Sequence, residues 1–124
     1  MSRILVVDDD NAIRHMVVQL LASEHYDVTE AENGARALER VRAERPDGIV
    51  LDLMMPVMDG PAFLEACRLE PGCEDIPVVV ISATHDILDV ASQPHVKACI
   101  AKPFDLDALV AVVTRFVPPT NPPA

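Results

Sequence analysis

Residues 49–60 of this chain read IVLDLMMPVMDG and constrain the possible fold more than any other stretch. Three apolar residues followed by Asp52 predict a buried strand that ends on a carboxylate. Pro56 and Gly60 then favour a loop before the next helix can begin. In an open parallel α/β sheet, ligands bind outside the carboxyl ends of the strands, because the connecting loops part there. The stretch therefore predicts that Asp52 lies at the ligand-binding edge of such a sheet.

The rest of the chain alternates between short apolar runs and amphipathic segments. The apolar runs predict strands at residues 3–7, 26–31, 48–51, 76–81 and 96–101. A helix is expected after each strand, although the fourth, from about Thr84, looks short because Pro94 interrupts that region. Strands that alternate with helices imply right-handed crossovers. The predicted fold class is therefore α/β, a doubly wound five-stranded parallel sheet flanked by five helices.

Short polar residues mark the expected helix starts, because their side chains can accept hydrogen bonds from the free N–H groups of a first turn. The candidates are Asp10 or Asn11, Asn33, Asp59 and Asp105. Along the first helix, the helical period predicts one buried apolar stripe, made of Ile13, Met16, Val17, Leu20 and Leu21.

The composition suits one domain, since 124 residues of which 50% are hydrophobic can bury a real core. We expect the domain to span residues 1–117 and the proline-rich residues 118–124 to be a tail or a truncated linker. A net charge of −10, with Lys97 and Lys102 as the only lysines, argues against direct nucleic-acid binding. The first residues contain no long apolar segment, so we expect no membrane insertion and a cytoplasmic location.

The three cysteines, Cys67, Cys73 and Cys99, are an odd number without metal-ligand spacing. We interpret them as structural thiols rather than as disulfide partners or zinc ligands. Cys67 is expected in the core beneath the third helix. Free thiols would also agree with a reducing compartment.

Polar side chains follow four of the predicted strands and should meet at one edge of the sheet: Asp8, Asp9, Asp52, Ser82 and Lys102. Three clustered carboxylates repel one another, and a hard divalent cation relieves the repulsion. Mg²⁺ is the best candidate, because it favours carboxylates, waters and a phosphate oxygen. A carboxylate can also attack a phosphoryl group, provided that the metal and Lys102 neutralise the transferring oxygens.

The spacing of Asp52, Met55, Pro56, Met58, Asp59 and Gly60 resembles the D-x-x-M-P-x-M-D-G run of bacterial response-regulator receiver domains, and the likeness covers roughly residues 3–117. The resemblance implies a flavodoxin-like receiver fold with strand order 2-1-3-4-5. It also implies a phosphoacceptor signalling domain of a two-component system, which at most catalyses its own phosphorylation and dephosphorylation.

The resemblance assigns roles to individual residues. Asp52 is the implied phosphoacceptor, and Asp8 and Asp9 are the implied Mg²⁺ ligands, together with Asp52 and the backbone carbonyl of Met54. Ser82 matches the residue that hydrogen-bonds the phosphoryl oxygens. Lys102 matches the lysine of a K-P-F sequence, whose bond to Pro103 is often cis in this family.

Protein partners are implied as well. A histidine kinase or a histidine phosphotransfer protein would dock around Ile13, Arg14, Pro103 and Phe104 and hold donor and acceptor in line. An output protein, or a second copy of the chain, would bind the surface formed by the fourth helix, the fifth strand and the fifth helix.

The fifth helix supports such an interface. Its sheet-facing stripe is predicted to contain Leu106, Leu109, Val110, Val113 and Val117. The opposite side carries Ala108, Ala111 and Val112, with Arg115 as the only charge near its centre. An apolar outer face favours contact with another protein, with Lys97 and Arg115 at the rim. The alternative is that the alanines are present only because alanine has a high helix propensity, and not because they contact a partner.

Two departures from the family pattern concern the output switch, by which phosphorylation would change partner binding, and the fourth helix. Cys99 stands three residues before Lys102, where the family usually carries Tyr or Phe. The segment from Ser82 to Lys102 is slightly shorter than usual, and QPHVKAC replaces a stretch that normally contains glycine.

Two other functions stay open. A phosphohydrolase of the haloacid-dehalogenase type would use Asp8 as nucleophile and Asp10 as the second aspartate of a D-x-D motif. Against it, the chain has no room for a cap domain and no paired aspartates after Lys102. The other alternative is a receiver-like module that binds its partner without phosphorylation, which the missing aromatic at Cys99 would allow.

Overall fold

The structure of the chain is a computed structural model that describes residues 1–82 and 95–119. Within these residues the strands are β1 (Arg3–Val7), β2 (Asp27–Ala31), β3 (Gly48–Asp52), β4 (Val78–Ser82) and β5 (Val96–Ala101). The helices are α1 (Asn11–Ser23), α2 (Gly34–Ala43), α3 (Gly60–Leu69) and α5 (Leu106–Phe116). The helix predicted from about Thr84 lies outside the described residues.

The five strands form one parallel sheet in the order β2-β1-β3-β4-β5, as the resemblance implied. Every residue of β3 and β4 is buried. These strands are almost entirely apolar because helices cover both faces of the sheet. Within the described ranges, no helix combines the length and the hydropathy needed to cross a bilayer.

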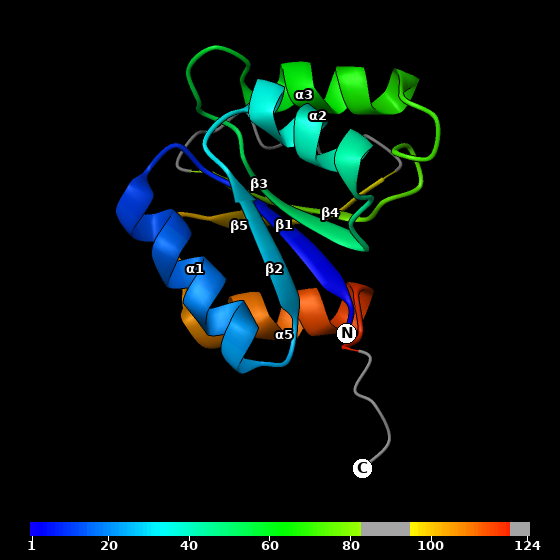
Figure 1. Cartoon of the computed structure of the whole chain (residues 1–124). Coiled ribbons are helices and arrows are strands. Elements are labelled where there is room, and N and C mark those ends of the chain that lie inside the picture. The colour runs from blue at the N-terminus through cyan, green and yellow to red at the C-terminus, as the bar shows by residue number, and fades with distance from the viewer. Residues whose placement is uncertain (83–94, 120–124) are drawn as a thin grey trace.

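Helices α2 and α3 cover one face of the sheet, and α1 and α5 cover the other (Figure 1). Alternate residues of β1 point to the two faces, so Leu5 and Val7 belong to the core under α2 and α3, whereas Ile4 and Val6 belong to the other core. The doubly wound architecture is therefore confirmed, with four helices in the described part of the chain.

Each of these helices begins after a polar residue whose side chain accepts an N–H of the first turn. The four N-caps are Asp10, Asn33, Asp59 and Asp105, as predicted. Because these residues terminate the loops that leave the strands, they also fix where the strand-end side chains lie.

The loop between β3 and α3 packs against the start of α2. The amide of Gly34 donates to the carbonyl of Met58 at 2.9 Å, and a Cβ at position 34 would lie 2.7 Å from that carbonyl oxygen. In the same loop, Val57 is 86% exposed and has a φ of 67°. This backbone region is unfavourable for a β-branched residue. The loop is therefore held in a strained shape by its neighbours.

Cys67 and Cys73 form a disulfide, so the prediction of three free thiols was wrong for this pair. Their Cα atoms lie 5.2 Å apart, within the range that a disulfide needs. The separation is short because the chain turns back after α3, where Gly72 has a φ of 86° and the Cys73 amide donates to the Glu70 carbonyl at 3.0 Å. Cys99 is a free thiol.

The two predicted apolar stripes are each wrong in part. On α1, Met16 is 41% exposed. On α5, Val112 was predicted on the outer face but packs against the core, as does Phe116, so the buried stripe of this helix is rotated toward these two residues relative to the prediction. The remaining α5 pattern holds in part: Leu109, Val113 and Val117 are buried, Leu106 and Val110 half-buried, and Ala108 and Ala111 exposed.

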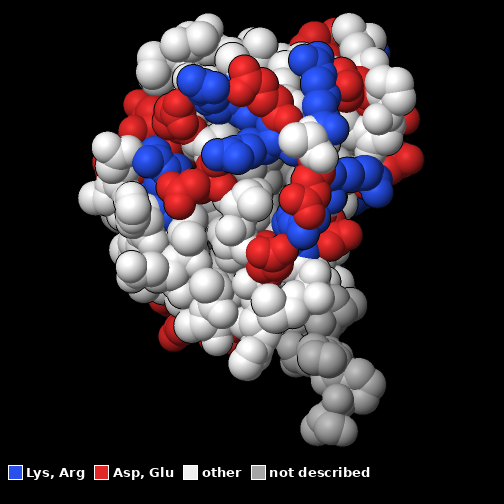
Figure 2. Space-filling model, viewed as in Figure 1, with Lys and Arg blue, Asp and Glu red and all other residues white. Residues whose placement is uncertain are grey.

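Arginine side chains gather over α2 and α3, where they alternate with carboxylates, while the lower part of the same view is mostly uncharged (Figure 2). Arg36 lies 3.4 Å from Glu32 and 3.0 Å from Glu39, and Arg42 pairs with Glu70 at 3.2 Å. Mixed charges of this kind form a solvated surface, and they do not make the continuous basic patch in this view that a nucleic-acid backbone requires.

Candidate functional site

Asp8 directly follows β1 and is fully buried. Its backbone N–H donates to the carbonyl of Ala31 at the end of β2, at 3.1 Å. Its carboxylate accepts hydrogen bonds from the Asp10 amide at 2.9 Å and from Nζ of Lys102 at 3.1 Å. These contacts fix the Asp8 carboxylate at the carboxyl edge of the sheet.

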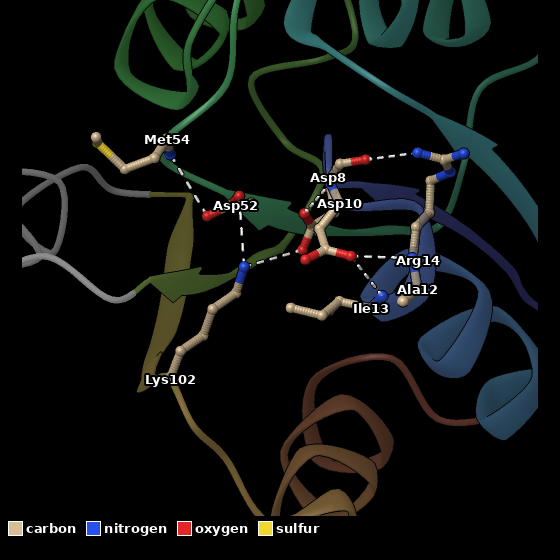
Figure 3. Close-up of polar contacts among 8 residues, drawn as sticks. All are labelled: Asp8, Asp10, Ala12, Ile13, Arg14, Asp52, Met54 and Lys102. Atoms are coloured by element: carbon tan, nitrogen blue, oxygen red, sulfur yellow. Dashed lines mark hydrogen bonds and ion pairs between the residues drawn. The ribbon is translucent and has the colours of Figure 1, made fainter.

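Asp10 faces the helix instead. Its side chain accepts the backbone N–H groups of Ala12 and Ile13 at 2.9 and 3.1 Å (Figure 3). The second aspartate of the proposed D-x-D motif is therefore occupied as the N-cap of α1. This contact counts against the phosphohydrolase reading, in which Asp10 would act on the substrate.

Asp52 is the last residue of β3 and is 4% exposed. One carboxylate oxygen lies 3.4 Å from Nζ of Lys102, and the other accepts the Met54 amide at 3.4 Å. Lys102 follows β5, two strands away, and its long side chain extends past the end of β4 to place the ammonium between Asp52 and Asp8 (Figure 3). The predicted convergence of these three residues is thus present.

Burial and the nearby Asp8 carboxylate raise the pKa of Asp52 from 3.8 to about 6. The Lys102 ammonium acts in the opposite direction without offsetting them. For Lys102, burial alone would lower the pKa, but the hydrogen bond and charge of Asp8, with the Asp52 carboxylate, leave it raised. Lys102 is therefore positively charged at neutral pH, and Asp52 is mostly ionised.

Asp8, Asp9 and Asp52 offer carboxylate oxygens that lie within 4.8 Å of one another. Asp9 is exposed whereas the other two are buried, so the cluster opens to solvent on the Asp9 side. Three carboxylates and one ammonium leave two negative charges, which one divalent cation would balance. Hard oxygen donors in an open site suit Mg²⁺. The residues therefore fit the metal that the sequence predicted.

Ser82 and Met54 lie next to this cluster. Ser82 is buried at the end of β4, and its backbone carbonyl accepts the Lys102 N–H at 2.9 Å. Met54 is 61% exposed and contributes its amide to Asp52. The predicted roles of the Ser82 hydroxyl and the Met54 carbonyl stay predictions.

An apolar pocket of about 360 Å³ adjoins Lys102 and is lined by Ile13, Met16, Lys102, Pro103 and Phe104. It explains why Met16 is exposed, since this side chain forms part of the pocket wall. The Lys102–Pro103 peptide bond is cis, as the resemblance implied. Ile13, Pro103 and Phe104 were predicted at this docking surface, whereas Met16 was not.

Cys99 lies in β5 opposite Val80 of β4 and packs, half-buried, against the core under α2 and α3. Burial raises the pKa of its thiol, so the side chain is neutral at physiological pH. A small neutral residue therefore occupies the position of the usual aromatic ring.

Arg14 was predicted only as part of a docking surface. Its side chain is 11% exposed, and it donates to the backbone carbonyl of Asp8 at 2.9 Å. No sequence motif signals this contact, because its acceptor is a main-chain atom.

The family model for the response regulator receiver domain matches residues 4–114. Response regulator MprA of Mycobacterium tuberculosis (strain ATCC 25618 / H37Rv) is 37% identical over 127 residues, covering 97% of this chain and 52% of MprA. MprA of Mycobacterium leprae (strain TN) is 38% identical over 127 residues, covering 97% of this chain and 53% of that protein. The chain thus spans about half the length of these relatives.

Solved structures agree on the fold. The chemotaxis protein CheY4 of Vibrio cholerae superimposes with a TM-score of 0.86 at 28% identity, covering 94% of this chain and 99% of CheY4. A putative response regulator from Chloroflexus aurantiacus J-10-fl gives a TM-score of 0.83 at 27% identity, covering 93% of this chain and 96% of that one.

Proposed function

Because this chain belongs to the response regulator receiver domain family, we propose that it accepts a phosphoryl group on Asp52 in a reaction that requires Mg²⁺. The proposed output is a change in which proteins the chain binds. In this reaction the chain is a signalling phosphoacceptor, and it catalyses at most its own phosphorylation and dephosphorylation.

One observation carries the proposal. The Lys102 ammonium lies 3.1 Å from Asp8 and 3.4 Å from Asp52, and Asp9 joins these two carboxylates in one cluster. The arrangement combines a nucleophile, a fixed positive charge and a set of metal ligands at one sheet edge. Each part contributes to the transfer of a phosphoryl group to a carboxylate.

The ionised Asp52 carboxylate attacks the phosphorus of the donor, a new O–P bond forms, and the bond between phosphorus and the donor's leaving group breaks. Lys102 is placed to stabilise the negative charge of the transferring oxygens. Ser82, at the end of the neighbouring strand, would donate its hydroxyl hydrogen to one of them. Asp8, Asp9, Asp52 and the Met54 carbonyl would hold Mg²⁺, which when bound supplies further charge neutralisation.

We propose a histidine kinase or a histidine phosphotransfer protein as the donor. The pocket formed by Ile13, Met16, Lys102, Pro103 and Phe104 offers it an apolar contact beside the reacting carboxylate. Such a contact would align donor and acceptor. Ile13→Glu is expected to slow transfer from the protein donor while leaving modification by acetyl phosphate unchanged.

For the output, we propose the surface formed by β5, α5 and the helix expected from about Thr84. Ala108 and Ala111 are exposed on α5 and allow close approach of another helix. The partner is an output protein or a second copy of the chain. A cytoplasmic location stays a prediction, and the Cys67–Cys73 disulfide removes the free-thiol argument for it.

The test is to incubate the chain with acetyl phosphate and Mg²⁺, reduce the acyl phosphate with borohydride, and locate the modified residue by mass spectrometry. Modification is expected at Asp52, and it should disappear in Asp52→Asn or in excess EDTA. Modification at Asp8 would favour the phosphohydrolase reading. Equal partner affinity with and without phosphorylation would favour a module that acts independently of phosphate.

A further inference from the structure

The Arg14 guanidinium contacts three separate segments. Nη1 donates to the backbone carbonyl of Asp8 at 2.9 Å, Nη2 to the side chain of Asn11 at 2.6 Å, and Nε to Glu30 of β2 at 2.8 Å. The guanidinium is planar and presents its donors at fixed angles. Its three acceptors therefore fix one another's positions at the end of β1, the start of α1 and the end of β2.

Through this contact, the backbone of Asp8 is held on both sides. Its N–H is bound by the Ala31 carbonyl at 3.1 Å, and its carbonyl is bound by Arg14, which is anchored by Glu30 of the same strand. Both backbone groups of Asp8 therefore depend on β2. With the main chain fixed, the carboxylate is oriented toward Lys102 (Figure 3).

Charge alone does not explain an arginine at this place. A positive guanidinium beside a cluster of carboxylates opposes the binding of a cation. Its donors also contact the Asp8 carbonyl, Asn11 and Glu30, and no described contact joins it to the carboxylates of Asp8, Asp9 or Asp52. The contact with the Asp8 main chain is thus the feature that serves the site.

We propose that Arg14, anchored by Glu30, is a positioning residue that holds Asp8 in the orientation that binds Mg²⁺. This role rests on the proposed function and extends it to β2, a strand that contributes no residue to the predicted metal cluster. Loss of a residue that orients a metal ligand commonly weakens metal binding by about 10- to 100-fold.

The proposal is tested by titrating Mg²⁺ into the full chain in a calorimeter. Arg14→Ala is expected to raise the Kd for Mg²⁺ about tenfold, although removal of a positive charge by itself would lower it. Arg14→Lys keeps the charge, but its single nitrogen cannot reach the three acceptors that the guanidinium contacts through Nε, Nη1 and Nη2, so its Kd should also rise. Arg68→Ala, which removes an exposed arginine paired with Glu65 on α3, is the charge-matched control and should leave the Kd unchanged.

A second measurement separates positioning from general damage. With acetyl phosphate, the Mg²⁺ concentration that gives half of the maximal phosphorylation rate is expected to rise in Arg14→Lys by about the same factor as the Kd, because the effect is on metal affinity. Glu30→Gln should raise the Kd less than Arg14→Lys does. The double variant should be no worse than Arg14→Lys alone, since both residues act through one contact.

An unchanged or lower Kd in Arg14→Ala, or full rescue by Arg14→Lys, would overturn the proposal. If Arg14→Ala does not fold, Arg14→Lys and Glu30→Gln decide the question, since an unchanged Kd for Mg²⁺ in both variants would also overturn the proposal. Failure of the parent chain to bind Mg²⁺ or to become phosphorylated would instead contradict the proposed function.

Discussion

Replacing Asp52 with asparagine in the metal-free protein is expected to raise the free energy of unfolding, by an amount that grows with pH. The folded protein must keep a buried carboxylate ionised close to Asp8, which raises the pKa of Asp52 from 3.8 to about 6. Asparagine has a similar shape and no charge, so it removes this cost. It also leaves Lys102 paired with Asp8 at 3.1 Å.

The pKa difference sets the size of the effect. At about 1.4 kcal/mol per pKa unit, ionising Asp52 costs the folded state up to about 3 kcal/mol. Because the folded pKa lies above the unfolded one, the cost is absent below about pH 4, grows between pH 4 and 6, and is complete above that range. The increase in the free energy of unfolding that Asp52→Asn causes at about pH 5 is therefore roughly half of the increase at about pH 7.5.

Urea denaturation in EDTA at these two pH values measures the effect, with exposed Asp75→Asn as the control. Added Mg²⁺ should stabilise the parent more than Asp52→Asn, because the variant has lost a ligand that favours the folded state. If Asp52→Asn were equally stable or less stable than the parent at both pH values, the reasoning would be refuted. The ion pair with Lys102 would then outweigh the cost of burial.

Three further predictions follow from other parts of the chain. Val57→Gly is expected to raise the free energy of unfolding by up to about 1 kcal/mol, because glycine adopts the left-handed backbone without strain. Urea denaturation measures this, with Val57→Ala as the control, and a lower free energy of unfolding in Val57→Gly would contradict it. Reduction of the Cys67–Cys73 disulfide is expected to lower the free energy of unfolding by about 2 kcal/mol, since the bridge closes a six-residue separation. Reductant should not change the stability of a Cys67→Ala/Cys73→Ala double variant, and an equal change in the parent and the double variant would disprove the assignment of the disulfide. Cys99→Tyr is expected to keep the rate of phosphorylation by acetyl phosphate within a few-fold while changing partner affinity; complete loss of phosphorylation would place Cys99 in the reacting site.

The sheet could be predicted because its signals are local. Strand bounds at 3–7 and 96–101 were correct, since the mainly apolar residues there are followed directly by Asp8 and Lys102. The fourth strand begins two residues later than predicted, at Val78. Ile76 is instead part of the turn that follows α3, where its amide donates to the Cys73 carbonyl at 3.0 Å, and Pro77 has no N–H to donate to the sheet.

The acidic cluster could be predicted because parallel topology brings all strand ends to one edge. The disulfide and the Arg14 contacts could not. Cys67 and Cys73 meet only because the chain reverses after α3, and Arg14 meets Glu30 at a sequence separation of 16 residues. Neither contact is signalled by a sequence period or a motif, since both depend on how separate segments are arranged in three dimensions.

The close approach of Gly34 to the loop between β3 and α3 limits how this protein can be engineered. Exchanging a helical glycine for alanine is a standard way to raise stability. At Gly34 the added Cβ would lie 2.7 Å from the carbonyl oxygen of Met58, a main-chain atom that can yield only if the loop after Asp52 moves. The first turn of α2 and that loop must therefore be redesigned together. A library of variants that changes the sequence of only one of them would miss the combinations of helix and loop sequences that fit each other.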